Sequence, residues 1–198
     1  MGKVKLGYTL ALLLLGSSLY SQSNYKMGSD YSFIIRGGSN IRDWSEFVAD
    51  ADGIASVSME KEGYLNIYEV RILIRASDIK SMGVEGTAMN KRTYETLKAD
   101  QYPTISFIAT TPVGFLAMDG KKHLVETDGI LVIAGTRKII SLRPIVSVNT
   151  DGNIDIEGDV FLKMSDFGIN PPVALFGLLQ VKDELTVHFS VRLTPEFN

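Results

Sequence analysis

The chain has 198 residues, of which 45% are hydrophobic and 22% charged, and its net charge is −3. This hydrophobicity excludes a disordered chain, and the lack of several apolar runs of about 20 residues excludes a polytopic membrane protein. The length allows one ordinary domain or two small ones. The chain has no Cys and two His, which removes disulfides, thiol catalysis and Cys-based metal sites. The negative charge offers no electrostatic case for binding nucleic acid.

Residues 1–21 have the layout of a secretory signal peptide. Lys3 and Lys5 precede an apolar run over residues 6–15, and small and polar residues follow it. The run is too short to span a bilayer comfortably, and the alternatives are a buried N-terminal helix or a retained anchor. We therefore expect a periplasmic or secreted protein, without a Cys to carry a lipid anchor, whose single domain covers residues 24–198.

Alternation of apolar and polar residues predicts strands through most of that domain. In chain order these are residues 31–36, 42–48, 54–60, 68–76, 105–110, 129–134, 138–148, 154–163 and 184–194. Acid–glycine pairs are expected to form the turns: Asp52-Gly53, Glu62-Gly63, Asp119-Gly120, Asp128-Gly129 and Asp151-Gly152. Many strands separated by turn residues indicate an all-β sandwich or barrel.

One segment, residues 88–99 (AMNKRTYETLKA), has the composition of an α-helix. Met89, Thr93 and Leu97 lie at helical spacing and form one narrow stripe. Pro103 follows and prevents the helix from continuing. We expect this helix to lie across a sheet or to close a barrel mouth, with its Met and Tyr either in core packing or in contact with a ligand.

No catalytic motif is present in the sequence. His123 and His188 lie in no metal-binding pattern, and there is no G-x-S-x-G, Walker A or G-x-G-x-x-G sequence. Asp166 lies in a D-F-G tripeptide, but the other kinase motifs are missing. We therefore predict no catalytic residue, no metal site, no cofactor and no enzymatic activity. A barrel of about eight strands can hold one small ligand, and a barrel or sandwich filled by its own side chains is the alternative.

Four segments together resemble the YceI-like family of exported lipid-binding proteins. They are residues 37–44 (GGSNIRDW), 89–107 (MNKRTYETLKADQYPTISF), 131–142 (LVIAGTRKIISL) and 162–191, which contains F-G-I-N-P-P. Arg42 departs from the pattern, because many members carry His there. The resemblance implies an antiparallel, lipocalin-like β-barrel of about eight strands with one short helix near residues 88–99. It also implies non-catalytic binding of a long isoprenoid lipid, such as a polyprenyl phosphate or an isoprenoid quinone, for sequestration or transport. The alternative is a structural or stress-linked envelope module with a solid core and no ligand.

If the barrel encloses a lipid, the inward residues of its strands should line the lumen. These are Phe33, Val70, Ile72, Ile74, Ile105, Phe107, Val187, Phe189 and Val191. Trp44, Met89, Tyr94, Leu97 and Phe167 are expected to close an end or to touch the lipid. The candidates for contact with a phosphate head group are Arg36, Arg42, Lys91 and Arg92. Core packing, for the apolar residues, and a solvated surface, for the basic ones, remain the alternatives.

The apolar run at residues 173–179 (VALFGLL) follows two prolines and falls in a predicted loop. Either this loop folds back onto the barrel, or it is a portal or lip that transiently contacts a membrane, since exposed apolar patches mark contact sites. The sequence makes no prediction of oligomeric state.

Overall fold

The computed structural model describes residues 22–60, 63–83 and 86–196; the predicted signal peptide lies outside this part of the chain. The strands are β1 (Gln22–Ser39), β2 (Asp43–Val48), β3 (Ala51–Met59), β4 (Tyr64–Arg75), β5 (Ile79–Ser81), β6 (Thr104–Ala109), β7 (Val113–Ala117), β8 (Lys122–Leu124), β9 (Thr127–Ile133), β10 (Thr136–Leu142), β11 (Ile145–Val148), β12 (Ile154–Lys163), β13 (Val173–Ala174) and β14 (Leu179–Pro195). The helices are η1 (Ala76–Asp78), α1 (Gly86–Thr96), η2 (Met164–Phe167) and η3 (Leu175–Gly177).

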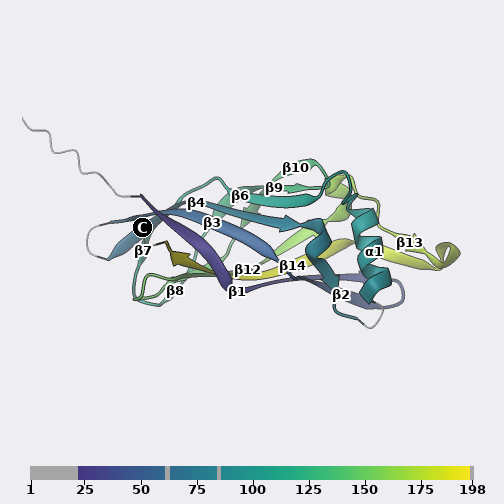
Figure 1. Cartoon of the computed structure of the whole chain (residues 1–198), viewed down its shortest axis with the longest axis horizontal. Coiled ribbons are helices and arrows are strands. Elements are labelled where there is room, and N and C mark those ends of the chain that lie inside the picture. Colours follow the sequence, from purple (N-terminus) through teal and green to yellow (C-terminus); the bar gives the residue numbers. More distant parts are fainter. Residues whose placement is uncertain (1–21, 61–62, 84–85, 197–198) are drawn as a thin grey trace, which may run out of the picture.

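The strands pair antiparallel and curl into an elongated, barrel-shaped sheet (Figure 1). Its hydrogen-bonded order is β10-β9-β6-β4-β3-β1-β14-β12-β11-β8, with β2, β5, β7 and β13 attached to this path. The predicted all-β, lipocalin-like class with one short α-helix is confirmed, but the strands are more numerous than about eight. The reason is that long strands change partners along their length: β1 pairs with β3 near its start and with β2 near its end.

Helix α1 confirms the predicted helix, and it begins slightly earlier than expected. It lies at one end of the barrel, beside β5 and η1 (Figure 1). The chain leaves the helical conformation after α1 through Lys98, whose φ is 53°, and Pro103 then leads into β6. The prediction of a helix near a barrel mouth therefore agrees with its position.

Two of the predicted turns are wrong. Gly120 and Gly152 have positive φ and do form turns, whereas Gly53 and Gly129 lie inside β3 and β9. Gly129 is required for a different reason: the ring of Phe107 occupies the space that a Cβ at this position would take. The glycine thus permits close approach of a neighbouring strand's side chain.

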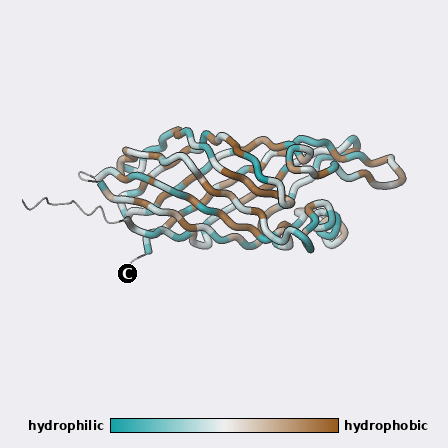
Figure 2. Tube along the Cα trace, turned by 90° about the horizontal axis from the view of Figure 1, so that it is seen from above, coloured by the Kyte–Doolittle hydropathy of each residue, from teal (hydrophilic) through white to brown (hydrophobic). Residues whose placement is uncertain are grey.

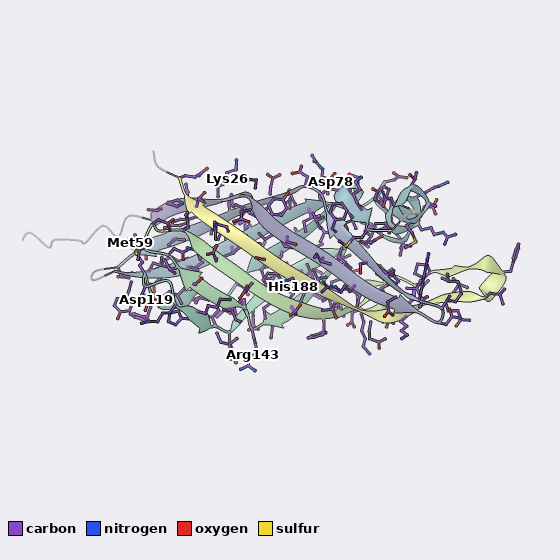
Figure 3. The ribbon with its side chains drawn as sticks, turned by 90° about the horizontal axis from the view of Figure 1, so that it is seen from below. Lys26, Met59, Asp78, Asp119, Arg143 and His188 are labelled. Carbon is purple, nitrogen blue, oxygen red and sulfur yellow. The ribbon has the colours of Figure 1, made fainter. Side chains whose placement is uncertain are left out.

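The tightest part of the core lies at the barrel end opposite α1. Leu65, Ile154 and Leu193 are completely buried there, and Leu65 pairs with Met59 at the end of β3. Figure 3 places Met59 at this end and Asp78 near α1. We refer to the region around Leu65, Ile154 and Leu193 as the packed end, and to the opposite region as the helix end.

Candidate functional site

A cavity of about 1040 Å³ occupies the barrel interior from the edge of the packed end to α1. This volume is at the top of the range of roughly 300–1,000 Å³ for small-molecule pockets. The core is therefore not solid throughout. The structure therefore differs from the alternative of a barrel that is completely filled by its own side chains.

Long strands line the cavity through their inward side chains. On β4, Val70, Ile72 and Ile74 recur at every second position along the wall. Toward the packed end of the same strand, Leu65 and Ile67 are buried. The period of two holds within each half, but Tyr68 is an extra residue between the halves, so the inward positions change there from odd to even numbers. Leu65 is buried in the core, Ile67 lies at the boundary, and Val70, Ile72 and Ile74 border the cavity.

All but one of the predicted lumen residues lie on the cavity wall. These are Phe33, Val70, Ile72, Ile74, Met89, Leu97, Ile105, Phe107, Phe167, Val187, Phe189 and Val191, and Trp44 joins them. Their side chains come from β1, β2, β4, β6, β14, α1, η2 and the residue that follows α1.

Tyr94 is the exception, because its side chain lies outside the cavity. Its hydroxyl accepts a hydrogen bond from Lys80 Nζ at 2.9 Å and lies 2.8 Å from the carbonyl oxygen of Ser77. These bonds attach α1 to the outer side of β5 and η1. Met89, Thr93 and Leu97 line the cavity instead, as their shared helical face predicts.

The four basic candidates occupy different surroundings. Arg42 and Arg92 line the cavity at the helix end. Arg36 is exposed and borders a shallow depression on the outer surface. Lys91 forms an exposed ion pair with Glu95, with the two charged atoms 3.8 Å apart. The structure therefore brings two of the four basic residues to the cavity and places the other two outside it.

Glu46 is a lining residue that the sequence reasoning did not select. Its side chain is only 4% exposed, and its Oε1 accepts a short hydrogen bond from the Thr93 hydroxyl of α1. Burial raises the pKa of this carboxyl above its ordinary value, and the hydrogen bond from Thr93 partly opposes that shift. A signal for it was present, because Trp44, Glu46 and Val48 alternate along β2 and all three line the cavity.

The polar lining is concentrated at the helix end. Lining residues there include Ser39, Arg42, Asp43, Ser45, Glu46, Ser81, Arg92, Thr93, Glu95 and Thr96. Toward the packed end the cavity floor is formed by apolar residues such as Ile67, Val146 and Val191. The cavity is thus amphipathic along its length, which is suited to a molecule with a polar head and an apolar tail.

Exposed lining residues mark where the cavity reaches the surface. Met82 and Val173 lie at the helix end, and they are 58% and 63% exposed. Tyr68 and Thr111 are exposed lining residues farther along the wall. There, β4 changes its partner from β7 to β6.

The hairpin formed by β13, η3 and the start of β14 projects beyond the helix end (Figure 1). The residues at the tip of this projection are strongly hydrophobic (Figure 2). Phe176 is fully exposed with a φ of 56°, and Leu178 is 72% exposed. The tip is therefore not folded back onto the barrel. At its base, Val173, Leu179 and Val181 belong to the cavity wall, so the exposed tip is continuous with the lumen.

Neither His lies on the cavity wall. His188 is on the outer face of β14 (Figure 3), where its Nδ1 lies 3.0 Å from Asp159 Oδ1. Within residues 22–60, 63–83 and 86–196, no group of three or more His, Asp or Glu residues is arranged to hold a metal ion. In the same part of the chain, no helix has the length and apolar character needed to cross a membrane.

Comparisons with known proteins agree with this geometry. A polyisoprenoid binding domain from Saccharophagus degradans, implicated in plant cell wall breakdown, has a similar structure, with a TM-score of 0.67 and 12% identity over 89% of this chain and 100% of that one. Burkholderia cenocepacia BcnA gives a TM-score of 0.61 and 15% identity over 83% and 96% of the two chains. The Campylobacter jejuni YCEI protein gives 0.53 and 19% identity over 77% and 85%. At these identities the likeness shows the fold.

Among curated protein sequences, none matches the chain significantly. The sequence profile of the YceI-like domain matches residues 37–193. That range includes all four segments whose resemblance to the family was noted from the sequence, and it covers most of the barrel. The chain therefore belongs to the YceI-like family.

Proposed function

We propose that this protein is a non-catalytic carrier of a long isoprenoid lipid, either a polyprenyl phosphate or an isoprenoid quinone, in the periplasm or outside the cell. The observation that carries the proposal is the cavity of about 1040 Å³ with its amphipathic wall. The polyisoprenoid binding domain of similar fold supports the choice of lipid. The signal-peptide pattern of residues 1–21 supports export.

The chemistry of the wall is sufficient for useful affinity. A branched isoprenoid chain packs on Ile, Val, Leu and Phe side chains without needing a charged partner. Burying ten methylene equivalents at about 0.8 kcal/mol each contributes about 8 kcal/mol before ordering costs, which corresponds to roughly micromolar affinity. A carrier needs binding in this range, because the lipid must also be released.

We further propose that the hairpin tip contacts a lipid bilayer during loading and release. Phe176 and Leu178 are exposed apolar side chains at the end of a projection whose base forms part of the cavity wall. A lipid tail could pass from the bilayer into the lumen along this surface without crossing water. Large exposed apolar surfaces on soluble proteins mark such contacts.

The direct test is to identify what the protein carries. The protein is purified from its own cell envelope without detergent, and native mass spectrometry is followed by organic extraction and lipid analysis. We expect a bound long-chain isoprenoid at close to one molecule per chain. Repeated recovery of lipid-free protein that also fails to take up added isoprenoids would contradict the proposal.

A further inference from the structure

Among the described residues of the cavity wall, Glu46 is the one deeply buried acid. It sits on β2 at the polar helix end, and α1 covers it through the hydrogen bond from Thr93. Its own strand pairs with β1 and β5 on either side. Its place is therefore set by three neighbouring elements and not by a mobile surface loop.

Only one of the two carboxyl oxygens of Glu46 has a hydrogen-bond partner among the described residues. Oε1 accepts the hydrogen bond from Thr93, and among the described residues nothing bonds to Oε2. Oε2 is also not one of the sealed, partnerless polar atoms of the described structure. Oε2 is therefore accessible and has no protein partner among the described residues, so it can bond to a guest.

The charges around this oxygen disfavour an anionic guest. Within the described part of the chain, Glu46 has no ion pair with any Lys or Arg. Asp43 and Glu95 line the same end of the cavity, together with Arg42 and Arg92. Arg42 and Arg92 are exposed whereas Glu46 is buried, so the deepest charged group that a head group meets at this end is an acid.

We infer that Glu46 is the head-group contact of the cavity and that it selects isoprenoid lipids with an uncharged, hydrogen-bonding head, such as a hydroxyl or a quinone carbonyl, over those that carry a phosphate. The neutral carboxyl, which burial favours, donates to a quinone carbonyl or to a hydroxyl oxygen. The carboxylate only accepts, so it can bond to a hydroxyl but not to a quinone carbonyl. A phosphate is repelled by the carboxylate, and to reach the buried neutral acid it must give up the water and the exposed cations that would solvate it nearer the surface.

This inference rests on the proposed function, and its test separates the two. Trp44 is the single tryptophan of the chain and lines the cavity, so its fluorescence reports lumen occupancy. The protein is titrated with four probes of one chain length: a prenyl alcohol, a prenylated quinone, the prenyl monophosphate and a headless isoprenoid hydrocarbon. We expect the alcohol and the quinone to bind more tightly than the hydrocarbon. The phosphate should bind at least about tenfold more weakly than the alcohol.

Variants then assign the preference to Glu46. Glu46→Leu should lose the advantage of alcohol over hydrocarbon, about threefold to tenfold, while it still binds the hydrocarbon, which also shows that the cavity is folded. Glu46→Gln keeps the hydrogen bonds and removes the charge, so it should retain the alcohol preference and bind the phosphate more tightly than the wild type does. Asp100→Asn, at an exposed acid that follows α1 and does not line the cavity, is the matched control and should change neither ratio.

Two results would overturn the inference while leaving the carrier function in place. One is tighter binding of the phosphate than of the alcohol by the wild type, and the other is an unchanged ratio of alcohol to hydrocarbon affinity in Glu46→Leu. If no probe of any kind changes the Trp44 fluorescence or appears bound in native mass spectra, the proposed function fails and this inference fails with it.

Discussion

The two ends of the barrel are built from the same strands but differ in how they are filled. At the packed end, Leu65, Ile154 and Leu193 are completely buried and belong to one hydrophobic core cluster. At the helix end, Ile72 and Phe189 continue the same inward faces but border a cavity of about 1040 Å³. The same strands run through both ends and alternate in each, although a bulge on β4 shifts its alternation by one residue between them. Hydrophobic alternation therefore determines which face points inward, and it does not determine whether that face meets another side chain.

The difference also indicates how stability and binding are divided. Contacts at the packed end hold the barrel together, since fully buried aliphatic groups contribute most to folding. Side chains at the helix end are partly buried and remain available to a guest. The predictions below either strengthen this division or remove it, and they run from the largest expected effect to the smallest.

The same substitution at the two ends should have very different consequences. Ile154→Ala should lower the free energy of unfolding by about 4 kcal/mol, because it leaves a cavity in tight packing. Ile72→Ala enlarges a space that already exists and should lower it by only about 1–2 kcal/mol. Urea denaturation of both variants measures the difference. Equal losses at the two sites would remove the distinction between the ends.

A larger side chain should reduce stability at the packed end and lipid binding at the helix end. Val57 is 1% exposed at the packed end, so Val57→Trp should overpack the core and lower the free energy of unfolding by about 1–3 kcal/mol. Val70 lines the cavity, so Val70→Trp should be tolerated and should block lipid uptake. Thermal unfolding and lipid recovery are measured on both. A destabilised Val70→Trp that still carries lipid would mean that this part of the wall is filled in solution.

Loss of the hydroxyl above Glu46 should loosen the helix end. Thr93→Val leaves the buried carboxyl without its donor and should lower the free energy of unfolding by about 1–2 kcal/mol. Thr96→Val, on the same helix and the same cavity wall, is the control and should have little effect. Hydrogen exchange in α1 should rise in the first variant and not in the second.

Acid should affect the two ends in opposite directions. Burial raises the pKa of Glu46, so the native state holds its proton more tightly than the unfolded chain does. The contribution of this group to stability is present at low pH and is lost as pH rises past the ordinary carboxyl range. At the packed end, the hydrogen bond from Arg192 lowers the pKa of Asp155. That contribution is present at neutral pH and is lost as pH falls through the lowered pKa.

Two neutral variants test these signs. Relative to the wild type, Glu46→Gln should become more stable as pH rises from about 4 to 7. Asp155→Asn should be less stable than the wild type at neutral pH, and the gap should close in acid. Urea denaturation from about pH 2 to pH 7 measures both, because the Asp155 contribution is lost only below the ordinary carboxyl pKa. Parallel pH profiles of the two variants would contradict the assignment.

The hairpin tip should contribute least to stability. Phe176 is fully exposed, so Phe176→Ser should change the free energy of unfolding by less than about 0.5 kcal/mol. It should nevertheless slow the transfer of isoprenoid from vesicles, because it removes the apolar side chain of the proposed bilayer contact. Ile139→Ser, at an exposed position on β10, is the matched control. Equal transfer rates for both variants would remove the hairpin from the loading pathway.

Much of the site could be read from periodicity. Val70, Ile72 and Ile74 were predicted as inward residues because strands alternate, and the same reasoning on β2 would have found Glu46 between Trp44 and Val48. Glu46 was missed because a charged residue is ordinarily assigned to the wet face. Only the tertiary contact with Thr93 shows why an acid is tolerated on the inner face.

Other errors came from signals that are ambiguous without neighbours. Tyr94 lies three residues before Leu97 on the helix, yet its hydroxyl bonds to the outer side, to Lys80 and Ser77. The Asp128-Gly129 pair has the composition of a turn, but Gly129 lies within a strand, where its missing side chain leaves space for the ring of Phe107. Helical spacing and dipeptide composition describe the local chain and carry no information on which element packs against it.

The sequence by itself determined the class of the protein: strands with one inward apolar face, a short helix near residue 90 and the segments of the YceI-like family. Tertiary structure alone decided that the barrel is packed at one end and hollow at the other. The physical reason is that burial depends on the distance between facing walls. That distance is set by how strands change partners and where α1 and the hairpin lie, and no local pattern of residues encodes it.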